Sequence, residues 1–409
     1  MRLFMLLASL VYASQVVALS FDEALAIALR EAPALFADAA RIDAARQLVL
    51  PAGELPDPKL ALGLDNLPIN GANAYSLNDD FMTMQRIGLM QEFPNHAKRN
   101  ARVAAANSEV ALAEAKARIT RLNLTRDTAL AWITRYSIER QLAQVDLFRE
   151  ENHLFDQVVR AQLVSGGPVA AIVAPRQEAA FIAERLDELT SRRHQAIAML
   201  RRWIGAQADE PLTGAPPDWS IAAEALASGL HRHPELLAFD PETKIVDAQL
   251  AEAIADKKSD WALEVAYQKR GAQFGDMLSM QVSIDLPLFA DSRQDRKIAA
   301  KRAERLSLDS ERESLLREHQ EALEVSLAEH RRLDKSVNRQ QQVLMPLAKE
   351  KVQLAMADWR SGKGTLTDLI DARRENIELA LQAIELEGER QLSAARLHYS
   401  YSNAIGEQP

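Results

Sequence analysis

The feature that most constrains this chain is an internal duplication of its whole plan. In the first half Glu23–Ala26 leads to Pro33, and in the second half Glu224–Ala227, which has the same four residues, leads to Pro234 at the same spacing. In each half there follow a short helical stretch, two segments of alternating polarity, a long charged helical run with a glycine-containing break, and a closing helix. Because the same order of features recurs in both halves, chance similarity is a poor explanation and we predict a structural repeat.

The repeats set the domain organisation that we expect. The first repeat is predicted to span 19–208 and the second 221–409, with the proline- and glycine-containing segment 209–220 as the linker between them. Within each repeat the long helical run turns back as a hairpin, with the turn at about 165–168 in the first repeat and at about 361–365 in the second. We therefore expect two helical hairpins in one chain.

The helical runs carry narrow apolar stripes that are typical of coiled coils. Apolar residues recur at spacings of mostly three and four, with charged residues between them, at Leu130, Ile133, Ile138, Leu142, Val145 and Phe148 and again at Ile377, Leu381, Ile384 and Leu392. The run from about Lys98 to Val164 reaches about 90–100 Å as a helix, which is longer than a compact domain can use. We predict long coiled-coil hairpins, with a secreted fibrous coil or a helical bundle as the alternatives. The opening helix has Ser20 as its N-cap with Glu23 three residues on, and Pro33 ends it.

Four short segments alternate between apolar residues and polar or small residues. They lie at about 59–66, 84–93, 261–269 and 277–287. One apolar face and one polar face suit a strand between lipid and a water-filled lumen. Hydrocarbon does not tolerate the unpaired edges of a four-stranded sheet, and the smallest bacterial barrels have about eight strands, so one chain has to share its barrel with copies of itself. The alternative is a soluble four-stranded sheet that caps a coiled coil.

The N-terminus predicts export from the cytosol. Residues 1–18 place one positive charge, Arg2, before a short apolar run and a small residue, Ala18, at the expected cleavage site, which is the layout of a secretory signal peptide. An N-terminal core helix is the alternative. No later segment has the uninterrupted apolar length of a transmembrane helix. The chain contains no cysteine, so we expect neither disulfides nor thiol chemistry, and no lipid anchor on an N-terminal cysteine.

The remaining composition excludes several classes of function. The net charge of −9 argues against a nucleic-acid partner. The sequence holds no glycine-rich phosphate loop, zinc signature or Ser/His/Asp arrangement. We therefore predict a protein that is not an enzyme and that uses no cofactor.

Two patterns contain residue types that bind metals, but neither predicts a metal site. His231 and His233 stand two residues apart on an expected helix, so their side chains point in different directions. Met82 and Met84 are expected to pack near a strand end rather than to bind a soft metal. We predict no metal site. The arginine pairs at 192–193 and 373–374 are interpreted as solvated helix faces or salt-bridge partners.

The stretch Trp359–Ala372 is the most specific signature in the chain. It places an aromatic residue and two glycines before an Asp-x-x-Asp-Ala helix start. Together with the signal peptide, the tandem halves and the two strands per half, it resembles the TolC-like outer-membrane efflux factors, and the resemblance covers nearly the whole mature chain, from about Leu19 to Gly406. The segments Leu55–Leu60 and Met82–Pro94 are most similar to the heavy-metal branch of that family, whose members include CzcC and CusC. That branch works with resistance–nodulation–division pumps.

This resemblance implies a homotrimer in the bacterial outer membrane. Three chains each supply four strands to a twelve-stranded transmembrane β-barrel in outer-membrane lipid, and their helical hairpins form a tunnel that extends into the periplasm. A periplasmic adaptor and an inner-membrane pump deliver the substrate, expected to be heavy-metal cations, to this passive exit duct. The alternatives are a periplasmic structural coiled-coil protein and an adaptor subunit without a pore, although an adaptor has one hairpin and this chain has two.

The same resemblance assigns roles to two acids at the second turn. It places Asp368 and Asp371 at the periplasmic aperture, where three-fold repetition brings carboxylates around a narrow mouth that attracts cations. Their i, i+3 spacing puts both on one helix face. The alternative is that both acids only favour the positive N-terminal end of a helix, capped by Thr365 or Thr367.

The turns also depart from the family. In its best-known member the gating contacts use a tyrosine, an arginine and an acid, and the matching positions here hold Trp359, Gly364 and Ala171. We therefore expect closure to rest on packing or other contacts. The two turns are in addition predicted to dock the hairpin tips of the adaptor, through Gly166, Gly167, Ala171, Trp359, Gly362 and Gly364.

Overall fold

The computed structural model describes residues 18–164, 166 and 169–401. Apart from Ala18, the predicted signal peptide lies outside the described residues, and so does Gly167 of the first turn. The described chain is mainly helical with one small sheet of four strands, which confirms the predicted α-rich fold with a small β part. Within that part of the chain, none of the helices is both long enough and apolar enough to cross a membrane.

The fold divides into two compact units, and each unit draws on both sequence repeats. The first unit consists of the described parts of Met1–Leu35, Ile119–His233 and Glu318–Pro409, and the second consists of Phe36–Arg118 and Pro234–Arg317. The hairpin tips of both repeats therefore lie in the first unit, and the strands of both repeats lie in the second. Each compact unit therefore combines corresponding elements of the two repeats.

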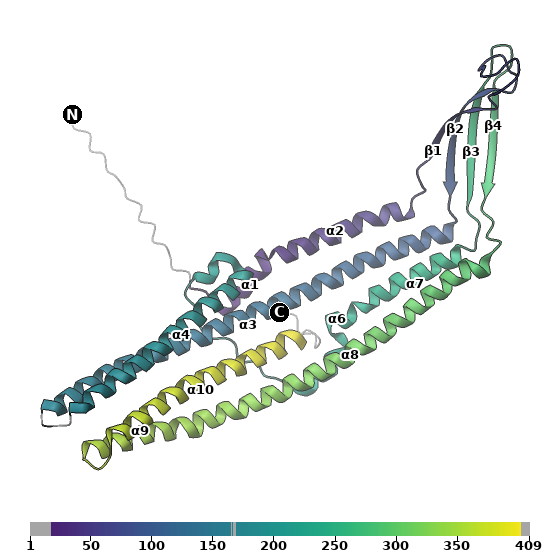
Figure 1. The fold of residues 1–409 in the computed structure, drawn as a ribbon. Coiled ribbons are helices and arrows are strands. Elements are labelled where there is room, and N and C mark those ends of the chain that lie inside the picture. Colours follow the sequence, from purple (N-terminus) through teal and green to yellow (C-terminus); the bar gives the residue numbers. More distant parts are fainter. Residues whose placement is uncertain (1–17, 165, 167–168, 402–409) are drawn as a thin grey trace, which may run out of the picture. The chain divides into compact units, whose positions relative to one another are not determined.

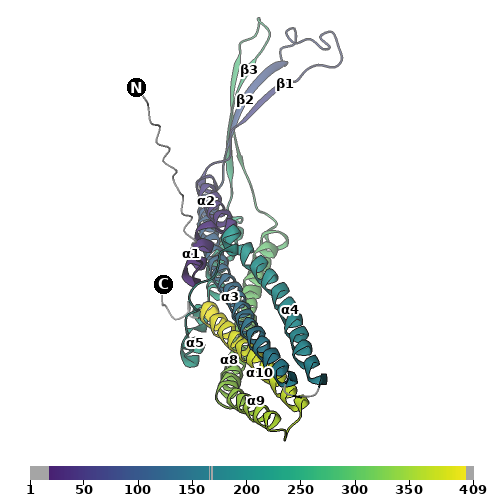
Figure 2. The ribbon, with the colours of Figure 1, turned by 90° about the vertical axis from the view of Figure 1, so that its left-hand side faces the viewer.

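In the second unit the four strands form one antiparallel sheet (Figures 1 and 2). They are β1 (Lys59–Asp65), β2 (Met84–Phe93), β3 (Trp261–Lys269) and β4 (Met277–Ile284), in that order across the sheet. The central pair, β2 and β3, joins the two repeats. The sequence predicts the last strand to 287, but β4 ends at Ile284, ahead of Pro287, which has no N–H to donate to a ladder.

Helices flank these strands in the chain. They are α2 (Pro33–Gly53) before β1, α3 (His96–Val164) after β2, α6 (Pro234–Leu237) and α7 (Phe239–Ala255) before β3, and the short η4 (Ala290–Ser292) and α8 (Gln294–Arg339) after β4. Asn95 caps α3, since its Oδ1 accepts from the Lys98 N–H at 2.9 Å. Lys98 Nζ lies 2.8 Å from Asp256 Oδ1 and 2.7 Å from Asp260 Oδ2. This network ties the start of α3 to the segment between α7 and β3.

The network shifts the pKa values of the three groups that form it. Burial lowers the pKa of Lys98, but its hydrogen bonds to Asp256 and Asp260 outweigh that effect and leave the pKa raised. Burial raises the pKa of both aspartates, and the same bonds outweigh it and leave both pKa values lowered. All three groups are therefore charged at neutral pH.

The first unit holds the remaining helices. They are α1 (Phe21–Glu31), η1 (Val169–Ile172), α4 (Val173–Ile204), η2 (Gly205–Asp209), α5 (Ala223–Gly229), η3 (Leu230–Arg232), the π-helical η5 (Gln340–Leu344), α9 (Met345–Arg360) and α10 (Leu366–Tyr401). The Glu23 N–H donates to Ser20 Oγ at 3.2 Å, so Ser20 is the N-cap that the sequence predicts for α1. The hairpin helices α9 and α10 lie side by side (Figures 1 and 2).

One core cluster of the first unit surrounds Trp132, which is fully buried on α3. Phe21 of α1 meets its ring edge-on, with ring centroids 5.4 Å apart. The segment predicted as a linker is ordered against this core, because Leu19 and Leu212 form a parallel bridge. Arg135, also fully buried, donates to the carbonyls of Ala208 at 2.6 Å and Glu210 at 2.8 Å.

A second core cluster joins the predicted coiled-coil stripes of α3 and α10 to α4. Its buried members are Ile138, Val145, Phe148, Ile182, Leu189, Ala196, Ile377 and Ala380. The helices approach closely at Gly388, where an added Cβ would lie 2.7 Å from the Cβ of Ser137. Glycine at 388 is therefore a packing requirement, because any larger side chain would push α10 away from α3.

Candidate functional site

The sheet carries two chemically distinct faces, and the register shows them as rows across all four strands. Residues directly opposite one another share a face. Leu60 pairs with Leu89, Leu89 with Val265, and Val265 with Met280. The neighbouring row, Leu62, Ile87, Tyr267 and Leu278, follows the same pattern.

The opposite face is mostly polar or small, with Met84, Met90 and Met277 as its large apolar residues. Its rows include Ala61, Gly88, Ala266 and Ser279, and also Gly63, Arg86, Gln268 and Met277. Arg86 and Glu264 form a salt bridge on this face. The separation of the faces is what a wall between lipid and water requires.

The apolar face has no cover within the described chain. Eleven large apolar side chains on this face of the four strands are exposed. Leu62 at 71% and Met280 at 70% are among the most exposed. Among the described residues, β1 and β4 each pair with a strand on one side only, so both edges present unused backbone groups. Within the described chain, this face and both sheet edges are therefore left uncovered.

The second hairpin turn is held by backbone hydrogen bonds. The N–H groups of Lys363 and Gly364 both donate to the carbonyl of Asp358, at 2.9 and 3.0 Å. Gly362 has a φ of +75°, a left-handed conformation that favours glycine. Gly364 sits so close to the end of α9 that an added Cβ would lie 2.9 Å from Asp358 Cβ. Both glycines are therefore needed to make the turn.

The aspartates predicted at the aperture lie in the first two turns of α10, and both are exposed. Asp368 forms a capping box: its N–H donates to Thr365 Oγ1 at 3.1 Å, and its Oδ2 accepts from the Thr365 hydroxyl at 2.6 Å and N–H at 3.1 Å. The hydroxyl bond and then the N–H bond hold the pKa of Asp368 below its usual range. Asp368 thus has the capping role considered from the sequence, while Asp371 lies one turn further along the exposed surface.

The first hairpin turn differs from the expectation at one residue. Ala171 was predicted to dock a partner, but it is buried, at 6% exposure, against Phe155, Val159 and Leu369. Trp359 packs on the same cluster, with its ring centroid 6.1 Å from that of Phe155. The two turns therefore contribute to one core.

The apolar surface at the first turn comes from other residues. Val164 is 92% exposed, Val169 80% and Val173 47%. Gly166 has a φ of +96° and open space around its Cα. These valines, and not Ala171, present apolar side chains beside the turn.

A buried ion pair that joins the two hairpins is the contact that sequence reasoning missed. Glu178 of α4 is fully buried, and Arg373 of α10 donates to it from Nε to both carboxylate oxygens at 3.0 Å and from the terminal nitrogen at 2.7 Å. The guanidinium also lies 4.8 Å from the ring centroid of Phe155. The sequence leaves Arg373 as either a solvated residue or a salt-bridge partner, and it cannot identify an acid 195 residues away.

Comparison with solved structures shows the fold class. The chain is similar to a membrane protein from Pseudomonas aeruginosa, with a TM-score of 0.79 and 16% identity over 93% of this chain and 90% of that one. It is similar to CusC, described as forming a transmembrane channel, with a TM-score of 0.76 and 15% identity over 96% and 93%. It is also similar to the outer membrane protein VceC from Vibrio cholerae, with a TM-score of 0.75 and 18% identity over 94% and 96%. The sequence matches no protein-family model and no curated protein.

These likenesses define a class by fold. The chain has the fold of outer-membrane channel proteins, over nearly its whole length and nearly the whole length of theirs. The identities are low, so the likeness is one of architecture: a small four-stranded sheet together with two long helical hairpins.

Proposed function

We propose that this chain is the outer-membrane subunit of a tripartite efflux system. It acts as a passive exit duct for substrate that an inner-membrane pump and a periplasmic adaptor deliver, and it performs no chemical step. The observation that carries this proposal is the sheet, whose apolar rows cross all four strands while the opposite face is mostly polar or small. The fold shared with outer-membrane channels supports it.

The open edges of β1 and β4 call for copies of the same chain. Pairing β1 of one copy with β4 of the next closes a barrel, and three copies supply twelve strands, enough for a wide lumen. In this trimer the apolar rows face lipid and the row with Ala61, Gly88 and Ala266 faces the lumen. The tandem repeats 19–208 and 221–409 then give six hairpins around one axis, and residues 1–18 are removed on export.

The test uses the absence of cysteine in the chain. Leu62→Cys is combined in turn with cysteine at Met280, Val282 or Ile284, and membranes are oxidised. We expect one of these pairs to give disulfide-linked dimers and trimers in a fraction that resists carbonate extraction, and Leu62→Cys alone to give none. A protein that carbonate removes, and that migrates as a monomer in mild detergent, would instead be a periplasmic coiled-coil protein or adaptor.

The tip of the second hairpin is proposed as the periplasmic aperture. Over residues 358–371 the chain has three acids, Asp358, Asp368 and Asp371, and two bases, Arg360 and Lys363, a formal charge of −3 + 2 = −1 per chain. Three copies give a mildly cation-favouring mouth. Asp368→Asn with Asp371→Asn should weaken cation preference in planar bilayers, and unchanged selectivity would contradict the assignment of these residues to the aperture.

The first turn is proposed to dock the adaptor. The exposed valines at 164, 169 and 173 and the open left-handed Gly166 offer an apolar surface for a hairpin tip; Trp359, Gly362 and Gly364 shape the second turn. Val169→Cys should cross-link to a cysteine in the adaptor tip. The matched control is the buried Ala171→Cys, which should not. Equal cross-linking by both, or by neither, would contradict this docking surface.

The substrate is proposed to be a heavy-metal cation. The segments Leu55–Leu60 and Met82–Pro94 are similar to the heavy-metal branch, and CusC is among the structures with the same fold. Deleting the gene should raise cellular metal content under metal stress, and the wild-type chain should restore it. A deletion that sensitises cells to organic compounds and leaves metal content unchanged would contradict this substrate class.

A further inference from the structure

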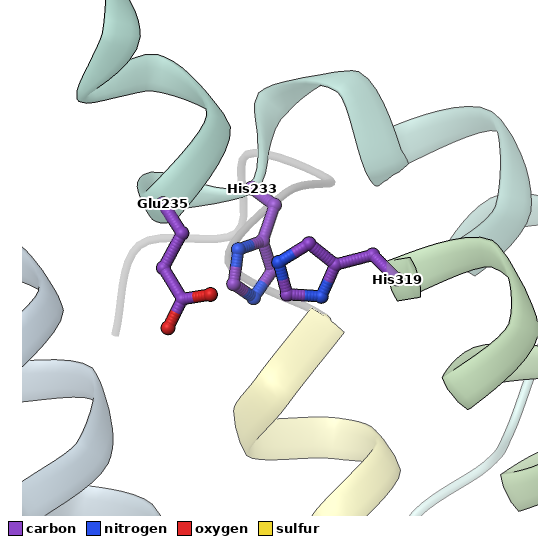
Figure 3. A group of neighbouring side chains, drawn as sticks. All are labelled: His233, Glu235 and His319. Atoms are coloured by element: carbon purple, nitrogen blue, oxygen red, sulfur yellow. The ribbon is translucent and has the colours of Figure 1, made fainter. Parts of the chain in front are cut away.

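Two histidines that are far apart in the sequence meet in the first unit. His233, at the C-terminal end of η3, and His319, on α8, have ring centroids 4.1 Å apart with ring planes inclined at 41° (Figure 3). His233 is buried, at 3% exposure, while its neighbour His231 is exposed. The two residues are 319 − 233 = 86 positions apart, so the pair could not be found from local spacing.

A carboxylate accompanies this pair. Glu235 is two residues beyond His233 and is the second residue of α6, so its backbone lies close to that of His233. His233, Glu235 and His319 each offer a ligand atom, and these atoms all lie within 4.8 Å of one another (Figure 3). Ligand atoms around one tetrahedral ion lie about 3.4 Å apart, so binding one ion requires these three ligand atoms to move closer together.

We propose that His233, His319 and Glu235 bind a divalent transition-metal ion, with Zn²⁺ as the reference ion. Two neutral imidazoles and one carboxylate form a donor set that zinc takes readily, with water as the fourth ligand, and that suits magnesium or calcium poorly. The chain has no cysteine that could compete as a ligand. The ring of Tyr401, itself buried, lies 5.9 Å from the His233 ring and 6.5 Å from the His319 ring.

The burial of His233 indicates a structural ion and not cargo in transit. An ion held by a nearly inaccessible His233 exchanges slowly, whereas a duct needs sites that release quickly. The ion would fix α8 to the end of η3, and because metal binding adds to folding free energy, it would raise thermal stability. This inference does not depend on the proposed transport function.

The experiment uses the detergent-purified full chain, made without a histidine tag and stripped with EDTA. We expect calorimetry to show one Zn²⁺ per chain, a Tm that rises with Zn²⁺ and not with Mg²⁺, and visible Co²⁺ bands of a tetrahedral site. His319→Gln and Glu235→Gln should each weaken Zn²⁺ binding at least tenfold. The matched control, His231→Ala on the exposed neighbour of His233, should bind like the wild type.

The outcomes separate the site from a simple ring contact. Zn²⁺ binding that survives both His319→Gln and Glu235→Gln, or that is lost in His231→Ala, would overturn the proposal, and so would a wild-type chain that binds no Zn²⁺. If His319→Gln fails to fold, as judged by circular dichroism, Glu235→Gln still decides, because it replaces a partly exposed carboxylate with an amide of the same shape.

Discussion

Arg373→Gln should loosen the two hairpins more than any exposed charge substitution nearby. The guanidinium contacts both oxygens of Glu178, which is fully buried, and is itself only 12% exposed. Removing the arginine leaves a buried carboxylate without its cation, and breaking a buried pair in this way costs about 3–5 kcal/mol. The lost contact with the Phe155 ring adds about 0.5–2 kcal/mol.

The matched control is Lys351→Gln. Lys351 and Glu375 also join two helices of the first unit, α9 and α10, but their side chains are 57% and 47% exposed. An exposed pair of this kind contributes about 0–1 kcal/mol. The two substitutions remove one positive charge each from neighbouring places, so the difference between them reports burial rather than net charge.

The assay is thermal unfolding in one detergent, with amide hydrogen exchange in α4 and α10 as the local readout. We expect Arg373→Gln to lower the Tm by several degrees and to speed exchange in both helices, and Lys351→Gln to do neither. The double variant Glu178→Leu with Arg373→Leu should recover much of the loss, because it removes both buried charges. If the two single variants unfold alike, the ion pair does not hold the hairpins together.

Two further predictions concern charge networks and pH. Because the pKa of Asp368 is lowered in the folded chain, its contribution to stability is present above the ordinary value of 3.8 and is lost as the pH falls through the lowered value. Opening of the start of α10, measured by hydrogen exchange, should therefore increase in acid, and Asp368→Asn should abolish this increase. An unchanged pH profile in the variant would refute the capping role. Lys98→Met should destabilise the chain by about 1–3 kcal/mol, since Asp256 and Asp260 lose their shared partner. Both aspartate pKa values should then rise, so the loss of stability on acidification that these two carboxylates cause in the wild type should become smaller, as measured by the free energy of unfolding across the acidic pH range.

The repeating pattern made the elements of the fold predictable. Alternation in the strands and three-to-four spacing in the helices depend on which residues face apolar surroundings, and a local reading of the sequence captures that. The strands accordingly lie within a few residues of the predicted ranges, and Ser20 caps α1 as expected. The order of the strands across the sheet was not predictable, because it depends on how the two repeats associate.

The missed contacts share a physical cause. Glu178 and Arg373 come from different repeats, and His233 and His319 lie 86 residues apart within the second repeat. On a long charged helix most ionic side chains are solvated, so the sequence alone offers no reason to single out one acid or one imidazole. Ala171 shows the reverse case. An alanine in an apolar turn fits both a docking surface and a core, and only the packing against Leu369 decides for the core.

The two units differ in whether one chain can complete them, and this difference bears on assembly. The hairpin unit buries aromatic and aliphatic side chains around Trp132 and satisfies Arg135 with backbone carbonyls, so its core is closed within one chain. The sheet exposes eleven large apolar side chains on one face, and among the described residues its two edges are unpaired. Fully burying one such side chain contributes about 1.5–3 kcal/mol, so covering this face outweighs any single contact within the unit. We therefore expect the hairpins to fold before the sheet finds its neighbours, and stability of the barrel to depend on the concentration of chains and on lipid.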